Sequence, residues 1–257
     1  MGTSVTNRIK YVKQPRGGYI NPKNMTEIVL GDGVEALNPD EVVSLGTVGT
    51  AVDYLTRFML GTPAVEAFKI SLYGASIAGE TERAKTLVRG IKGLDYESVI
   101  NAVRLCRYDV YFRTNIPEYM PVEDKPVDSA TVENIITMVN RALHFFDMYG
   151  PVVLDGFTFE GGYTYIVSTG DGDFTTKDTL WDFKVSKSPV KKEHTLQLLM
   201  YWRMGLHSIY PEFKKIKYLG IYNPRLNIVS RISVNDIPQS VIDEVETEVI
   251  GYTKHNR

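Results

Sequence analysis

Three short segments between residues 170 and 201 carry the side chains best suited to chemistry. They read Gly-Asp-Gly-Asp-Phe at 170–174, Leu-Trp-Asp-Phe-Lys-Val-Ser at 180–186 and Gln-Leu-Leu-Met-Tyr at 197–201. The middle segment has the composition of a strand, in which residues two apart share a face. Asp182 and Lys184 therefore project together, while Trp181, Phe183 and Val185 pack the other way. The sequence thus predicts a carboxylate and an ammonium group side by side.

Acidic residues just upstream of this pair point to a metal ion. If the chain forms a hairpin that turns near Thr176, the preceding strand brings Asp171 or Asp173 opposite Asp182 and Lys184. Carboxylate oxygens around a partly hydrated cation suit Mg²⁺ or Mn²⁺, since Mg²⁺ usually takes one or two protein carboxylates and keeps several waters. We expect Mg²⁺ or Mn²⁺ as cofactor, with Asp171 and Asp173 as alternatives for its first ligand.

A helix is expected to follow over residues 193–207. His194, Gln197 and Tyr201 are spaced three and four residues apart and so lie on one face of it, while Leu198 and Leu199 can face the core. The polar face is expected to look back towards the strand pair. Because no second histidine accompanies His194 at metal-ligand spacing, we interpret His194 as an ordinary helix-face residue.

These segments together resemble the core of the PD-(D/E)XK nuclease superfamily, in its RecB-like and phage-exonuclease-like branch. That family has an acidic residue at the end of one strand, acid-x-Lys on the next strand, and a helix that bears Gln and often Tyr. The matching residues are Asp173, then Asp182 with Lys184, then Gln197 with Tyr201. The resemblance covers roughly residues 150–235, and Gly172 stands where proline is common in the family.

The resemblance implies metal-dependent hydrolysis of DNA phosphodiesters, as an exonuclease rather than an endonuclease. Asp173 and Asp182 would be metal ligands, and Lys184 would orient or deprotonate the attacking water or offset charge on phosphorus. Gln197 would hold Lys184 or the water, and Tyr201 would contact the phosphate or a sugar. A restriction-type endonuclease and a nucleic-acid-binding or assembly protein without turnover are the alternatives.

Proteins of this family often add a further ligand from an upstream helix, and Asp53 is the candidate here. Asp53 and Arg57 are also four residues apart, which is typical of a surface ion pair on a helix. Lys187, Lys191 and Lys192 lie between the acid-x-Lys strand and the following helix. They are equally consistent with DNA phosphate contacts and with a solvated loop.

The elements that must position these residues follow from hydrophobic periodicity. Residues 1–45 are rich in Gly, Pro and Asn and predict an irregular arm with one or two short strands. Helical spacing over 46–149 predicts four or five helices, and residues 150–257 predict strand, strand, helix, strand, strand, helix. We therefore expect one nuclease domain over 46–257: a helical half at 46–149, then a catalytic αβ core at 150–257. The fold class is α/β, restriction-endonuclease-like, with a mixed central sheet flanked by helices.

Composition excludes few partners. The chain of 257 residues has a formal net charge of −2 and 43% hydrophobic residues, which is typical of a soluble globular protein. Its only cysteine, Cys106, cannot form an internal disulfide, and we expect a reducing, cytoplasmic environment. No signal-peptide core or uncharged stretch of membrane-spanning length is present, so no membrane association is expected. DNA is the expected partner; the oligomeric state is left open.

Overall fold

The computed structural model describes residues 2–33, 36–114 and 125–253. The chain divides into two compact units. The sheet unit consists of residues 1–30 and 146–257, and the helical unit consists of residues 31–145. The unit boundaries therefore fall at 30/31 and 145/146, whereas the sequence predicted 45/46 and 149/150.

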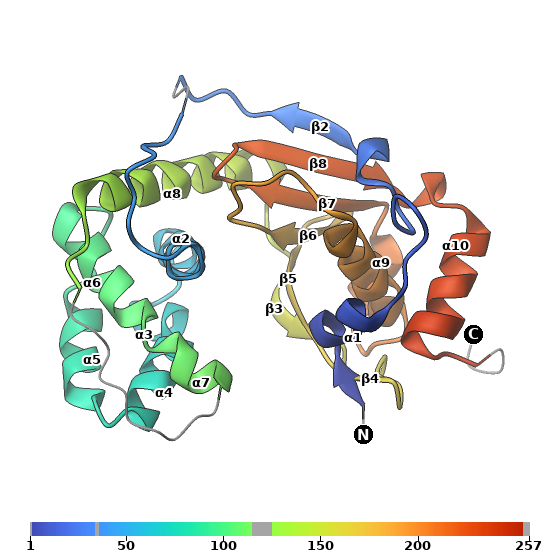
Figure 1. Cartoon of the computed structure of the whole chain (residues 1–257), viewed down its shortest axis with the longest axis horizontal. Helices are drawn as coiled ribbons and strands as arrows, with labels where there is room; N and C mark the ends of the chain where they lie inside the picture. Colours follow the sequence, from blue (N-terminus) through green and yellow to red (C-terminus); the bar gives the residue numbers. More distant parts are fainter. Residues whose placement is uncertain (1, 34–35, 115–124, 254–257) are drawn as a thin grey trace. The chain divides into compact units, whose positions relative to one another are not determined.

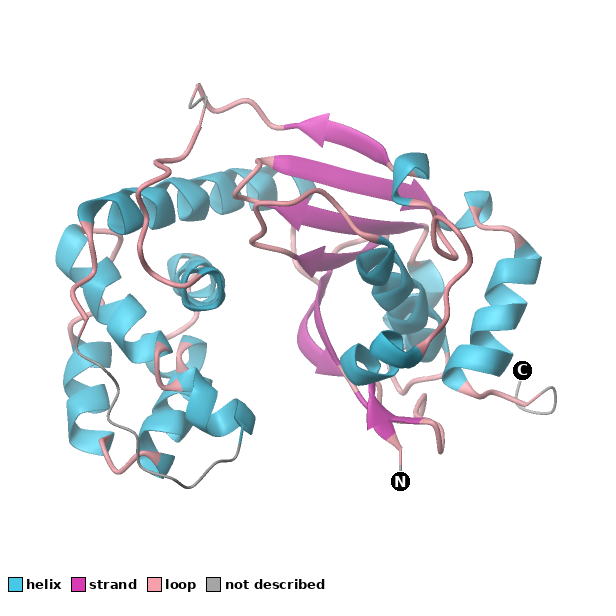
Figure 2. Cartoon of the chain, in the orientation of Figure 1, coloured by secondary structure: helices cyan, strands magenta, loops and turns pink. Residues whose placement is uncertain are grey.

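A six-stranded mixed sheet forms the centre of the sheet unit (Figures 1 and 2). Its strands, in spatial order, are β2 (Thr26–Val29), β8 (Ile228–Ser233), β7 (Tyr218–Asn223), β6 (Thr179–Phe183), β5 (Asp171–Thr175) and β3 (Leu154–Thr158). Only β6 and β7 run parallel in this sheet. The prediction of an α/β fold with a mixed sheet flanked by helices is thus confirmed.

Helix α9 (Lys192–Leu206) makes the crossover from β6 to the parallel strand β7. Parallel neighbours need such a crossover, and the helix lies on the sheet and packs against both strands. Its residues 195–202 are all buried, and the hydrophobic ones lie in one core cluster with Leu180, Leu219 and Ile221 of the two strands. This packing fixes the position of α9 over the middle of the sheet.

The opposite face of β5 and β6 is covered by aromatic side chains. Phe146 and Tyr149, at the end of α8 (Ser129–Tyr149), pack against Phe174 and Trp181, with ring centroids 4.9 and 5.2 Å apart. The Trp181 Nε1–H donates to Thr176 Oγ1 at 3.0 Å and so is satisfied although the ring is buried. Strand β6 is therefore covered on both faces. Trp181 and Asp182, as neighbours in the strand, point to opposite faces, as the predicted alternation requires.

The first thirty residues belong to the sheet unit and do not form a separate arm. Strand β2 is present, as is a second short strand, β1 (Thr3–Ser4), which pairs with β4 (Val167–Thr169). Helix α1 (Val5–Tyr11) was not predicted; it packs against α9 and buries Val5 and Ile9 in the core. Its brevity hides it, because seven residues hold only two turns of apolar spacing.

Helix α10 (Gln239–Glu244) completes the sheet unit and continues into a π-helical turn at Val245–Ile250. Single 3-10 turns lie at Pro22–Asn24, Pro211–Lys215 and Val234–Asp236. The Arg8 side chain of α1 donates to the carbonyls of Val249 and Glu248. The two ends of the described chain are thus joined within this unit.

Seven helices are present in the described part of the helical unit, where four or five were predicted. They are α2 (Leu45–Met59), α3 (Ala64–Ala67), α4 (Lys69–Ile77), α5 (Thr81–Arg89), α6 (Tyr96–Cys106), α7 (Asp109–Thr114) and α8. The difference arises because Phe68 divides α3 from α4 and a tight turn divides α6 from α7, and neither break contains Gly or Pro. Cys106 is buried among them.

Candidate active site

Asp182 and Lys184 lie on one face at the end of β6, as predicted. Lys184 Nζ is 3.0 Å from Asp182 Oδ1, and the two side chains are 30% and 3% exposed, Lys184 being the more exposed. The backbone N–H of Lys184 donates to the Tyr222 carbonyl at 2.9 Å, which continues the pairing of β6 with β7. The pair therefore has a buried acidic end and a basic end that reaches solvent.

The second carboxylate oxygen of Asp182 is unusual. Oδ2 is buried and has no hydrogen-bond partner among the described residues. A buried acceptor without a partner costs about 1 to 3 kcal/mol, and more when it carries charge. Asp182 Oδ2 is therefore placed to accept a cation or a donor that the described residues do not supply.

Asp173 is the upstream acid that lies beside Asp182. Strands β5 and β6 pair Phe174 with Trp181, so the next residues along the two strands are Asp173 and Asp182. Asp173 Oδ2 accepts the backbone N–H of Phe183 at 2.7 Å. Asp171 lies two residues earlier, exposed and paired with Thr158 of β3. The structure thus favours Asp173 over Asp171 as the partner of Asp182.

The turn of the hairpin, expected near Thr176, is short. Asp173 to Thr175 belong to β5, and the turn is confined to residues 176–178, closed by the Thr176 N–H donating to the Thr179 carbonyl at 2.9 Å. The antiparallel hairpin itself is confirmed. Strand β5 pairs with β3 on one side and with β6 on the other, and this pairing outweighs the turn propensity of its polar residues.

The two acids set the charge state of Lys184. Burial by itself would lower the Lys184 pKa, but the nearby carboxylates of Asp182 and Asp173 outweigh burial and raise the pKa. Lys184 is therefore a firmly charged ammonium group in this site.

Gln197 and Tyr201 form a buried pair on α9. Gln197 Nε2 donates to the Tyr201 hydroxyl at 2.9 Å. Lys184 or a water was the expected partner of Gln197. The Gln197 amide nitrogen instead donates to Tyr201, one turn along the same helix. Burial, with smaller contributions from the three nearby aspartates, raises the Tyr201 pKa, so the phenol keeps its proton. Tyr201 is thus a neutral hydroxyl close to Asp173 and Asp182, called the acidic pair below.

His194 belongs to the same cluster, although its sequence context suggested only a helix-face residue. Its Nδ1 accepts the backbone N–H of Lys191 at 3.3 Å, at the start of α9. Burial, then the positive charge of Lys184, lowers its pKa, outweighing the opposite effect of Asp182. The sequence did carry a signal, because His194, Gln197 and Tyr201 share one helical face.

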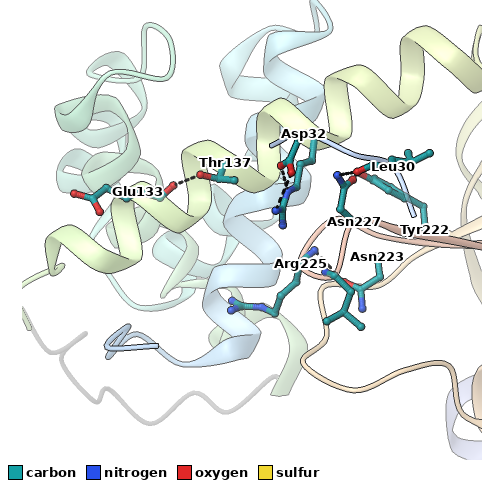
Figure 3. Close-up of polar contacts among 10 residues, drawn as sticks. Leu30, Asp32, Glu133, Thr137, Tyr222, Asn223, Arg225 and Asn227 are labelled. Atoms are coloured by element: carbon teal, nitrogen blue, oxygen red, sulfur yellow. Dashed lines mark hydrogen bonds and ion pairs between the residues drawn. The ribbon is translucent and has the colours of Figure 1, made fainter. Parts of the chain in front are cut away.

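The loop after Lys184 is held by the end of β7. Asn223 Nδ2 donates to the Ser186 carbonyl at 2.8 Å, and Asn223 Oδ1 accepts the Arg225 N–H at 3.0 Å. Figure 3 shows this turn, in which Asn227 adopts a left-handed conformation (φ 54°) and its side chain donates to the Leu30 carbonyl. Asn223 therefore ties the loop after Lys184 to the end of β7.

Lys187, Lys191 and Lys192 are all exposed, in the loop and the first turn of α9. Their exposure is compatible both with contacts to DNA phosphates and with a solvated loop. Phosphate contact by these lysines stays a prediction.

Asp53 lies in the helical unit, on α2, where its Oδ1 is 3.0 Å from Arg57 Nε. The structure therefore shows the predicted ion pair, and a role of Asp53 as a metal ligand stays untested. We expect Asp53→Asn to retain full metal-dependent activity and to change the unfolding free energy by about 0.5 kcal/mol or less. Cleavage assays and thermal melts of this variant measure both; loss of activity without loss of stability would make Asp53 a ligand.

The difference between Asp173 and Asp171 is directly testable. If the chain cleaves DNA with a metal ion, as the resemblance implies, we expect Asp173→Asn to lower that cleavage by about 10² or more, the range found when one electrostatic group is removed from an active site. Asp171→Asn on the same strand is the matched control and should stay within a few-fold of wild type. The reverse order of the two variants in a cleavage time course would make Asp171 the first ligand.

No known protein family, curated protein or solved structure matches the chain. In the described residues there is no group of three or more His, Cys, Asp or Glu side chains arranged to hold a metal ion. None of the described helices combines the length and hydrophobicity that crossing a bilayer requires.

Proposed function

We propose that the chain hydrolyses DNA phosphodiesters with a divalent metal ion and acts as an exonuclease. The observation that carries the proposal is the buried Asp182 Oδ2 without a hydrogen-bond partner among the described residues, beside Asp173 and next to an ammonium group. The acidic oxygens can hold a metal ion for phosphoryl chemistry, and the lysine places a positive charge beside it.

Asp173 and Asp182 are the residues that would hold Mg²⁺ or Mn²⁺. Two carboxylates are fewer than a calcium site needs, but they suit Mg²⁺, which keeps several waters. The free Oδ2 of Asp182 fits this assignment, because it supplies a hard oxygen that no described residue uses. When bound, such an ion would polarise the phosphoryl oxygen and lower the pKa of a coordinated water.

The remaining roles belong to side chains of the sheet unit. Lys184 carries its positive charge and would donate to the attacking water or to a phosphoryl oxygen as negative charge develops there. Tyr201 would donate a hydrogen bond from its hydroxyl group to the phosphate or to a sugar. Gln197 would position Tyr201, because its amide already donates to the Tyr201 oxygen.

The choice of DNA, of exonuclease action and of a restriction-endonuclease-like core rests on the resemblance to the PD-(D/E)XK superfamily. The arrangement that supports it is local: an acid on β5, acid-x-Lys on β6, and Gln with Tyr on the helix that follows β6. A DNA-binding or assembly protein without turnover, and a restriction-type endonuclease, are the competing assignments.

The deciding experiment compares linear with covalently closed DNA in Mg²⁺, in Mn²⁺ and in EDTA. We expect degradation of the linear DNA only, and only with metal, because carboxylates are the hard ligands such ions require. Rapid nicking of closed circles would move the assignment to an endonuclease. Binding without cleavage in every metal would favour the protein without turnover, and cleavage undiminished by EDTA would overturn the metal mechanism.

A further inference from the structure

A small cavity of about 50 Å³ adjoins Lys184 on the side away from Asp173 and β5. Its floor is the sheet, with Ile221 of β7 and Ile228 of β8, and its wall is formed by the loop after Lys184 and by α9. Space of this size holds one or two waters or one comparably small polar group. A small group in this space would lie beside the side chains of Lys184 and His194.

His194 lines this cavity together with Lys184. Because Nδ1 of His194 accepts the Lys191 backbone N–H, the proton of the neutral ring is on Nε2. The ring can therefore offer a hydrogen-bond donor, and its orientation is set by the start of α9. Lys184, which also lines the cavity, contributes ammonium protons and positive charge.

Other polar side chains also line the cavity, and among them hydrogen-bond donors outnumber carboxylates. Ser186 and Ser188 contribute hydroxyl groups, and Ser186 Oγ is held by the Ser188 N–H at 3.0 Å. Glu27, on the edge strand β2, is the single carboxylate among the described lining residues, and it is exposed to solvent. Solvent screens its charge more than it screens the half-buried Lys184.

We propose that His194 Nε2–H and Lys184 together bind a non-bridging oxygen of the DNA phosphate next to the scissile one. This assignment rests on the proposed function, because it takes the Asp173 and Asp182 pair as the place of cleavage. His194 is then a substrate-contacting residue that sets the register of the strand.

Two substitutions separate this role from a purely structural one. Asn at position 194 places an acceptor where Nδ1 lies and keeps the contact with the Lys191 N–H, but it has no group at the position of Nε2. Gln places an amide donor near the position of Nε2 and gives up the Lys191 contact. We expect His194→Asn to raise KM for a short linear DNA duplex about tenfold with little change in kcat, as loss of one hydrogen bond to a charged group predicts. His194→Gln should recover most of this loss.

A second measurement keeps the test independent of folding. A duplex with a neutral methylphosphonate at the phosphate next to the scissile one should be a poorer substrate for wild type, and His194→Asn should add little to that defect. Additive effects, or a His194→Gln variant weaker than His194→Asn, would overturn the assignment and make His194 a helix-start residue only. Wild-type protein that neither binds nor cleaves the unmodified duplex would instead remove the proposed function itself.

Discussion

Replacement of Lys184 by methionine is expected to abolish most turnover while metal binding survives. Methionine keeps much of the volume of the lysine stem and removes the charge, and Lys184 is not a metal ligand in the proposed site. Positioned proton donors and electrostatic groups are each typically worth about 10² or more in rate, so cleavage should fall by at least that factor. Asp182 stays buried in β6 and keeps both oxygens for the metal.

The matched control is Lys177→Met. Lys177 is exposed in the turn that joins β5 to β6, so the same hairpin loses the same charge away from the acidic pair. Calorimetric titration with Mn²⁺ and a cleavage time course should be run for all three proteins at one salt concentration, since DNA affinity depends steeply on salt. A Lys184→Met protein that cuts at the wild-type rate would show that Asp182 and Lys184 are an ordinary strand pair.

The Asp182 and Lys184 pair could be predicted because its information is local. Alternation with period two assigns both residues to one face whatever the partners of the strand are, and the buried Trp181 confirms the other face. The contact of Gln197 with Tyr201 is also local, because the two residues are four apart on α9. Gln197 makes this contact in place of the longer-range contact with Lys184 that was expected. Spacing predicted which residues share a face but not which atoms meet.

The ends of β5 could not be predicted, because its residues favour turns. They form a strand only because they pair with β3 and β6. Gly172 pairs with Phe157 of β3, and a Cβ at position 172 would collide with the Phe157 ring. The same arrangement recurs at Gly220, opposite Trp181. A glycine that weakens a strand in isolation thus makes room here for an aromatic ring from the neighbouring strand. Only the paired strand explains why Asp173 lies beside Asp182.

The cavity beside Lys184 could not be predicted from the sequence, for a different reason. Its lining comes from β2, the loop after β6, α9, β7 and β8, which are separated by up to about two hundred residues of chain. His194 therefore looked like one polar residue on a helix. Its tautomer, and hence its use as a donor, follows from a contact with the Lys191 backbone that spacing alone does not reveal.

Asp182→Asn is expected to remove the metal-dependent behaviour of the protein altogether. In wild type, Mn²⁺ at about 100 times its Kd should add about 2.7 kcal/mol to the unfolding free energy, because the ion binds the folded state. Asparagine keeps an acceptor for Lys184 but has neither the negative charge nor the second oxygen that Oδ2 supplies. Loss of a direct ligand should weaken the metal by more than the 10- to 100-fold typical of outer-shell changes.

Asp178→Asn tests whether this effect is specific. Asp178 lies in the same hairpin, where its Oδ1 accepts the Thr179 hydroxyl at 2.9 Å, so this control removes a structural carboxylate close to the site. Thermal melts with and without Mn²⁺ should show the gain for wild type and Asp178→Asn and none for Asp182→Asn, with cleavage following the same order. If Asp182→Asn were stabilised by Mn²⁺ as strongly as wild type, the unpartnered Oδ2 would have no part in metal binding, and the assignment of the acidic pair as a metal site would have to be abandoned.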